Sequence, residues 1–244
     1  MGEYLVFLDA DMILLDKDFI AKVRRALDEY PWISIRLIPI ALGNTSIEKA
    51  QILEEYIWSK EGYIDYRHCI KKQLLAERLF NPNLGINEDR DFFEDYLKKE
   101  KGLKPRFVDT TIGARVPSSF IRFAKRWLWY GRTSMKYYWK DGTTLKGLIM
   151  ALKENYRIVA PIGPILLAII GIFINIHVTL MFLLLYLALR IRLYRKIPKS
   201  SRSLKYFTLA SILSTIVRPL LFTLGFIYGM LSLLLKKRVK VSRE

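Results

Sequence analysis

The sequence predicts an α/β domain followed by a C-terminal membrane region. Short β-rich runs alternate with helical patterns over residues 1–117, which is typical of a sheet with flanking helices. A basic and aromatic segment fills residues 118–157, and long apolar runs follow between residues 158 and 235. A basic tail, 236–244, ends the chain. We therefore expect four consecutive regions with these bounds.

The first element predicted is a strand over residues 4–8, which delivers Asp9 and Asp11 at its carboxyl end. Ligands of open α/β sheets bind at the carboxyl ends of strands, and two carboxylates at this spacing suit a hard divalent cation. Thr45 and Glu48 form a capping-box pattern that opens a helix. The remaining predictions are helices over 16–30, 45–60, 71–79 and 87–97, and strands over 32–40, 63–70 and 106–109. Asp16 or Asp18 is expected to cap the first of these helices.

The net charge of +17 is concentrated in the last part of the chain. Of the 40 basic and 23 acidic residues, 14 basic residues and one acidic residue lie in residues 155–244. Basic clusters beside apolar runs are typical of contact with a membrane surface rather than of a nucleic-acid groove. We therefore expect membrane lipids, and no nucleic acid, among the partners.

The apolar runs predict a multi-pass protein of the cell membrane. Residues 158–189 carry no charged side chain. This run is long for one membrane pass of about 20 residues and short for two. The segment 190–205 holds seven cations and no anion, an excess typical of cytoplasmic loops. With the catalytic part also cytoplasmic, we expect two passes, at about 158–174 and 176–191. Arg218 and Pro219 interrupt the last run, about 207–235, which predicts an interfacial part followed by an inserted part.

Two classes of enzyme fit the acidic pair. In a sugar-nucleotide transferase, the pair would hold a Mg²⁺ or Mn²⁺ that bridges the diphosphate of the donor. Asp89, with Glu88 beside it at a loop-to-helix junction, would then deprotonate the acceptor hydroxyl. In a phosphatase of the haloacid-dehalogenase type, Asp9 would be the nucleophile and Asp11 an acid/base. That family expects threonine or valine where this chain has Ile13.

Four features occur in a fixed order along the chain. They are Phe-Leu-Asp-Ala-Asp-Met at 7–12, Glu-Asp-Arg-Asp-Phe at 88–92, Arg-Trp-Leu-Trp-Tyr-Gly-Arg at 126–132, and paired apolar segments. This order resembles membrane-bound family 2 glycosyltransferases. The resemblance implies a GT-A fold, a nucleotide-sugar donor and inversion at the anomeric carbon. It also implies that Asp9 faces the donor ribose, that Asp11 ligates the metal, and that Asp89 is the catalytic base of the Glu88–Asp89 pair.

The resemblance extends to the basic and aromatic segment. Arg126 and Trp127 resemble the tail of a Gln-x-x-Arg-Trp motif, although Phe123 replaces the glutamine, and Arg132 could supply a cation near the diphosphate. All three are therefore predicted to bind the donor.

The resemblance covers the whole chain but only the back half of the family's catalytic domain. It implies that the family's first, nucleotide-binding strands would precede residue 1 by about a hundred residues. Two hypotheses follow: a transferase that acts on a lipid-linked or polysaccharide acceptor at the cytoplasmic face, and a non-catalytic membrane subunit that partners a separate N-terminal half.

Overall fold

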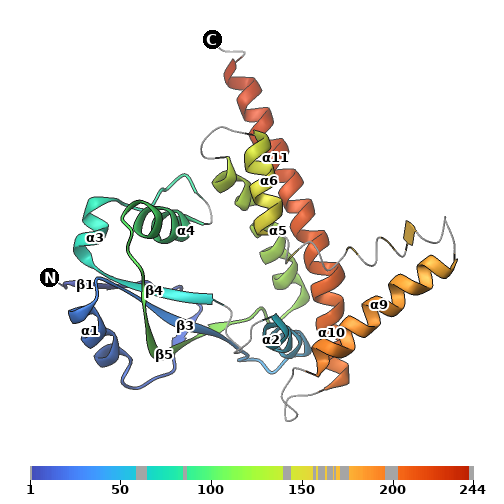
Figure 1. Ribbon diagram of the computed structural model, residues 1–244, viewed down its shortest axis with the longest axis horizontal. Coiled ribbons are helices and arrows are strands. Elements are labelled where there is room, and N and C mark those ends of the chain that lie inside the picture. Colours follow the sequence, from blue (N-terminus) through green and yellow to red (C-terminus); the bar gives the residue numbers. More distant parts are fainter. Residues whose placement is uncertain are drawn as a thin grey trace. The chain divides into compact units, whose positions relative to one another are not determined.

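The computed structural model describes residues 2–58, 65–84, 87–139, 144–155, 158, 163, 167, 169–170, 176–195 and 203–241. These residues form a mixed α/β unit and a helical unit (Figure 1). The first unit joins Met1–Pro82 with Asn87–Ser118, and the second joins Asn83–Ile86 with Ser119–Glu244. Each unit has its own core and is described by itself.

The first unit contains a five-stranded sheet and its helices, as the α/β prediction requires. The strands are β1 (Tyr4–Val6), β2 (Met12–Leu14), β3 (Trp32–Ile40), β4 (Asp65–Lys71) and β5 (Arg106–Arg115). The helices are α1 (Phe19–Glu29), α2 (Ser46–Trp58), α3 (Lys72–Glu77), the single turn α4 (Glu88–Arg90) and the π-helical η1 (Asp91–Glu100). The short strand β2 and the second half of β5 were not predicted from the sequence.

The two predicted helix caps have different outcomes. The capping box is confirmed, because Thr45 Oγ1 accepts from the Glu48 amide at 3.2 Å and Glu48 Oε2 accepts from the Thr45 amide at 2.8 Å. For α1, Asp18 is the N-cap residue by position, as predicted, but its side chain makes no cap hydrogen bond, and its amide donates to Asp16 Oδ1 at 2.9 Å. Asp16 instead accepts from Lys22 Nζ at 2.6 Å, and this hydrogen bond lowers the pKa of the Asp16 carboxyl below its usual value.

The sheet is curled, and its two edges are joined by a short linker. The strand order is β1-β4-β3-β5-β2, with β3 and β5 parallel and the other neighbours antiparallel. Four strand spacings amount to roughly 19 Å. The linker 7–11 includes a turn and reaches less than this, so β1 and β2 can only be connected if the sheet bends. The predicted acidic pair lies in this linker.

Both faces of β3 are covered, which explains its nearly continuous apolar sequence. Alternate side chains of a strand point to opposite faces. One face packs on α1 and the other on η1 and α3. The α1 face includes Ile33, Ile35 and Leu37 with Phe19, Val23 and Leu27, and the opposite face includes Trp32 and Ile70 with Phe92, Phe93 and Leu97.

The second unit is helical over its described residues. Its helices are α5 (Phe120–Tyr138), α6 (Thr144–Glu154), α9 (Ile176–Tyr194), α10 (Leu204–Ile212), the π-helical η4 (Leu213–Val217) and α11 (Arg218–Val241). Among the described residues, the helical run Leu204–Leu235 is long and apolar enough to cross a membrane, with a mean hydropathy of 1.7 in its most apolar window. The expected pass 176–191 lies within α9, and most of the expected pass 158–174 lies outside the described residues.

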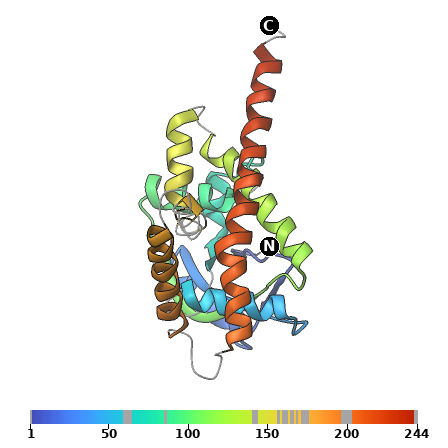
Figure 2. The same cartoon turned by 90° about the vertical axis from the view of Figure 1, so that its right-hand side faces the viewer.

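The predicted interruption at Arg218 and Pro219 is wrong for the backbone. Figure 2 shows α10, η4 and α11 as one continuous helix, coloured orange-red to red. Proline lacks an N–H group and its ring presses on the carbonyl four residues earlier, which here belongs to Thr215. That carbonyl lies in η4, where the wider π-helical turn accommodates the ring without ending the helix.

Helices α5 and α11 approach each other closely through three glycines. A Cβ atom on Gly131 of α5 would overlap the carbonyl oxygen of Phe222 on α11. Gly225 and Gly229, one helical turn apart on α11, lie in the same way against the backbone of α5. Small residues at this spacing allow helix backbones to come close in membrane proteins.

Candidate active site

The acidic pair lies on a β-turn that follows β1. The Met12 amide donates to the Asp9 carbonyl at 3.0 Å, and the Arg115 amide at the end of β5 donates to the Asp11 carbonyl at 3.0 Å. These bonds fix the backbone of both aspartates between the two edges of the curled sheet. The side chain of Asp9 is 63% exposed, so its carboxylate can meet a ligand.

Arg67 of β4 links the acidic pair to the second predicted motif. Its Nη2 lies 2.8 Å from Asp9 Oδ2, and its Nη1 lies 3.9 Å from Asp89 Oδ2. The antiparallel register of β1 and β4 pairs Val6 with Cys69, which places Arg67 beside the end of β1. The structure therefore brings together Asp9 and Asp89, which sequence reasoning placed in one site.

Glu88 and Asp89 begin the helical turn α4 after Asn87, whose φ is 64°. The Arg90 amide donates to Asp89 Oδ1 at 2.7 Å, while the Asp89 side chain remains 53% exposed. Oε2 of Glu88 is buried and has no hydrogen-bond partner among the described residues. One carboxylate of the pair is thus accessible to a substrate, and its neighbour points into the protein.

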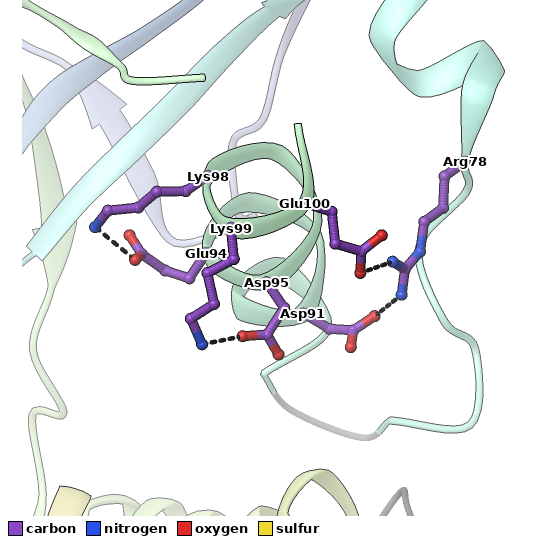
Figure 3. A network of polar contacts seen from close by, with 7 residues as sticks. All are labelled: Arg78, Asp91, Glu94, Asp95, Lys98, Lys99 and Glu100. Atoms are coloured by element: carbon purple, nitrogen blue, oxygen red, sulfur yellow. Dashed lines mark hydrogen bonds and ion pairs between the residues drawn. The ribbon is translucent and has the colours of Figure 1, made fainter. Parts of the chain in front are cut away.

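An ion-pair network anchors the helix that carries these acids. Figure 3 shows Arg78, just after α3, reaching Asp91 Oδ2 at 2.8 Å and Glu100 Oε1 at 3.3 Å. Asp91 is the first residue of η1 and its side chain is buried. Because Asp91 follows Asp89 by two residues, its pairing with Arg78 also limits the movement of Asp89.

His68 fixes the side of β4 opposite Arg67. Its Nδ1 accepts from Trp32 Nε1 at 3.1 Å and lies 2.8 Å from Ser34 Oγ, and its ring lies 4.1 Å from that of Phe93. Burial lowers the pKa of His68 to about 4. His68 is therefore a neutral packing residue near neutral pH, and its contacts hold the strand that presents Arg67.

The acidic residues suit a cation that is shared with a substrate. The described residues contain no group of three or more His, Cys, Asp or Glu side chains arranged for a metal. Mg²⁺ bound to nucleotides usually takes one or two carboxylates and completes its shell with water and phosphate oxygens. Arg67 binds Asp9 Oδ2, and metal binding by Asp11 stays a prediction.

The three donor-binding residues predicted from the basic segment lie on α5, in the second unit. The Trp127 ring lies 4.2 Å from the Arg218 guanidinium of α11, and Arg132 lies 4.8 Å from the ring of Tyr228. Arg126 is half-buried on the same helix. The structure gives Trp127 and Arg132 contacts that join α5 to α11, and donor binding by all three stays a prediction.

Comparison of the chain with models of protein families and with curated proteins finds no match. A function is therefore argued from the geometry of the site and the order of the motifs. Arg67 is the site residue that sequence reasoning missed, because it belongs to no motif. The signal available was an arginine on the strand predicted over 63–70, whose pairing with the strand before Asp9 no pattern specifies.

Proposed function

We propose that the protein is a membrane-associated, inverting glycosyltransferase. It would move a sugar from a nucleotide-sugar donor to a lipid-linked or polysaccharide acceptor at the cytoplasmic face of the cell membrane. The observation that carries this proposal is the position of Arg67 between Asp9 and Asp89. Two acidic motifs that are distant in sequence share one cation, as expected if one binds the donor and the other activates the acceptor.

In the proposed reaction, Asp89 takes the proton of the acceptor hydroxyl. The hydroxyl oxygen then attacks the anomeric carbon of the donor sugar from the face opposite the diphosphate. The bond between that carbon and the phosphate oxygen breaks, and the nucleoside diphosphate leaves with the electron pair. The exposed side chain of Asp89 can reach a hydroxyl directly, which general-base catalysis requires.

The residues on β1 and β4 would position both reactants. Asp9 would accept hydrogen bonds from the donor ribose, and Arg67 would hold Asp9 and Asp89 at a fixed separation. Asp11 would hold a Mg²⁺ or Mn²⁺, which acts as a Lewis acid towards the departing diphosphate when bound. On α5, Arg126, Trp127 and Arg132 would supply cations and an aromatic face for the donor.

The helical unit supports the proposed membrane association. The run Leu204–Leu235 could span a bilayer, and α11 exposes the leucines Leu220, Leu224 and Leu231. Helix α9 likewise exposes Leu180, Leu184 and Leu187. We propose that α9 is a second membrane helix and that the basic segment 190–205 lies on the cytoplasmic side.

The contact between Asp9 and Arg67 favours this function over the phosphatase hypothesis. A phosphatase of that type needs Asp9 as a nucleophile, and a carboxylate oxygen bound to a guanidinium at 2.8 Å has a reduced tendency to attack. A residue that only binds a ribose retains its role in the same contact.

Asp89→Asn tests the base directly. The change keeps the shape of the side chain and removes its ability to accept a proton, so sugar transfer should fall by about 10²–10⁴-fold. Transfer of radiolabelled sugar to acceptors would be measured in membranes that contain the protein, over a panel of nucleotide-sugars. Donor binding that depends on Mg²⁺ should persist in this variant and be lost in Asp11→Ala.

Glu94→Gln is the matched control. Glu94 lies on η1 and pairs with Lys98 at 2.7 Å, away from the contacts of Arg67. It should transfer sugar at the rate of the unchanged protein. Full activity in Asp89→Asn would remove the assigned base, and unchanged metal-dependent binding in Asp11→Ala would remove the metal role.

A further inference from the structure

Arg190 is a buried cation in the helical unit whose partners are all neutral. Only 6% of the residue is exposed. Its Nε donates to Tyr186 Oη at 3.2 Å, and its Nη2 donates to the Ser211 carbonyl at 3.2 Å and to Ser214 Oγ at 3.0 Å. A carboxylate partner is absent among the described residues, and Glu244 is the single acidic residue of segment 155–244.

These contacts solvate the guanidinium but do not neutralise it. An arginine remains protonated at any pH the protein meets, so the positive charge persists in an apolar unit. Its Nη1 group has no hydrogen-bond acceptor among the described residues. Ionisable residues inside apolar helical regions are costly, and they commonly mark a binding site or an ion pathway.

The helix that faces Arg190 is distorted where the contacts occur. Ser214 belongs to the π-helical η4, and the Ser211 carbonyl just before it accepts from both Arg190 Nη2 and, at 3.3 Å, Ser214 Oγ. Tyr186 Oη also donates to Thr215 Oγ1 in η4, at 3.3 Å. Single π-helical turns inside α-helices are frequent at functional sites. Here the turn supplies Ser214 Oγ, one of the three acceptors that hold the guanidinium.

The surroundings of Arg190 have the chemistry of a membrane interface. Tyr194, one turn after Arg190, packs against Phe207 with ring centroids 4.7 Å apart, so the end of α9 lies beside the start of α10 (Figure 1). The exposed cations Arg192, Arg195 and Lys205 are at these two helix ends. Cations with tyrosines at one end of apolar helices are typical of the headgroup region of a bilayer.

We propose that Arg190 binds the phosphate of an anionic membrane phospholipid. Nη1 would donate to a phosphate oxygen, and the exposed cations at the same helix ends would add electrostatic attraction. The phosphate would provide the negative charge that this segment of the chain lacks. The inference rests on the proposed membrane association and is independent of the transfer chemistry.

Binding of a short-chain phosphatidylglycerol to the full chain in a neutral detergent tests the site, with the zwitterionic phosphatidylcholine of equal chain length as the probe without net charge. Arg190→Gln should weaken phosphatidylglycerol binding by at least about tenfold, the effect of a lost charged hydrogen bond. Arg190→Lys keeps the charge and loses the planar guanidinium with its several donors. Its affinity for phosphatidylglycerol should therefore lie between those of the unchanged protein and Arg190→Gln. Arg192→Gln, on an exposed cation of the same helix, should weaken binding by no more than about twofold. Inorganic phosphate in large excess should not displace the lipid.

Each alternative result would overturn the site. Equal losses in Arg190→Gln and Arg192→Gln would mean general attraction of a basic surface. Arg190→Lys keeps the charge and replaces the glutamine variant in this test if that variant fails to fold. Phosphatidylglycerol binding that is unchanged in Arg190→Lys would mean that the guanidinium geometry is not used. Displacement by inorganic phosphate would indicate a soluble ligand. Sugar transfer in detergent, measured on the same samples, reports separately on the proposed enzyme.

Discussion

Arg67 in the first unit and Arg190 in the second unit have opposite kinds of partner. In the first unit, Arg67 is paired with the carboxylates of Asp9 and Asp89 at a partly exposed position. In the second unit, Arg218 lies on the Trp127 ring and Arg190 is surrounded by hydroxyl and carbonyl oxygens. Arg67 is thus neutralised by two carboxylates that remain accessible to water and to a polar substrate. Arg190 is held by neutral dipoles with no carboxylate partner among the described residues, which leaves it able to attract an anion.

The close packing of α5 against α11 in the second unit should be the easiest of these features to disrupt. Gly131→Ala places a methyl group onto the backbone of Phe222, which cannot move without displacing α11. We expect a loss of about 3 kcal/mol in the free energy of unfolding, the upper part of the usual range for overpacking. Urea unfolding of the full chain in neutral detergent, followed by tryptophan fluorescence, would measure it.

Gly163→Ala is the control for this change, because a methyl group at Gly163 meets no atom of the described residues within 4 Å. It should leave the unfolding midpoint within experimental error of the unchanged protein. Equal midpoints for the two variants would show that α5 and α11 do not pack through their glycines.

The paired arrangement in the first unit is tested by Arg67→Ala. Without the guanidinium, Asp9 and Asp89 lose their shared cation and their fixed separation. Sugar transfer should fall by about a hundredfold, comparable to the removal of one preorganised electrostatic contact. Initial rates over a range of donor concentrations would separate kcat from KM. Arg36→Ala removes another arginine of this unit, which pairs with the exposed Asp109 at 3.0 Å, and it is expected to transfer sugar at a near-normal rate.

A positioning role for Arg67 also predicts a specific signature. Arg67→Lys can reach one carboxylate but cannot bridge two, so it should restore part of the donor affinity and little of kcat. Full recovery of kcat in the lysine variant would mean that charge alone is needed, and would contradict the bridging role.

His68 makes the stability of the first unit depend on pH. Burial lowers the pKa of His68 from 6.5 to about 4, so between these values the unfolded chain binds a proton that the folded chain excludes. The contribution of neutral His68 to the free energy of unfolding is complete above pH 6.5 and is lost as the pH falls towards 4. We expect a loss on the order of 3 kcal/mol over this window, which His68→Gln should largely remove. Imidazole NMR titration would check it, with His177→Gln to assign the two histidine signals.

Several elements of the fold follow from local sequence. The strand β3 has the predicted bounds, because Pro31 marks its start and its residues are strongly β-forming. The capping box of Thr45 and Glu48 uses groups three residues apart, so it too is readable locally. The strand β2 was missed because three residues carry no period, and its pairing with β5 is set by a distant segment.

The residues of the candidate site likewise differ in whether local sequence reveals them. Asp9, Asp11, Glu88 and Asp89 stand out because carboxylates at a strand end and at a helix start have a local signature. Arg67 does not, because its role depends on the register of β4 against β1. The continuity of the helix through Pro219 was also hidden, since the π-helical turn that permits it has no known sequence pattern. Contacts between elements, rather than the elements themselves, are what the sequence leaves undetermined.

The smallest expected effect concerns the contact between Trp127 and Arg218. Trp127→Leu keeps an apolar side chain on α5 and removes the ring that lies 4.2 Å from the guanidinium. A cation–π contact is worth roughly 1 kcal/mol when partly desolvated, so the loss in stability should be about that size. The double-mutant cycle with Arg218→Met isolates the pairwise term from the change in volume. A coupling energy near zero would mean that the ring only fills space beside Arg218. If transfer also falls while stability does not, Trp127 acts on the donor as the motif predicts.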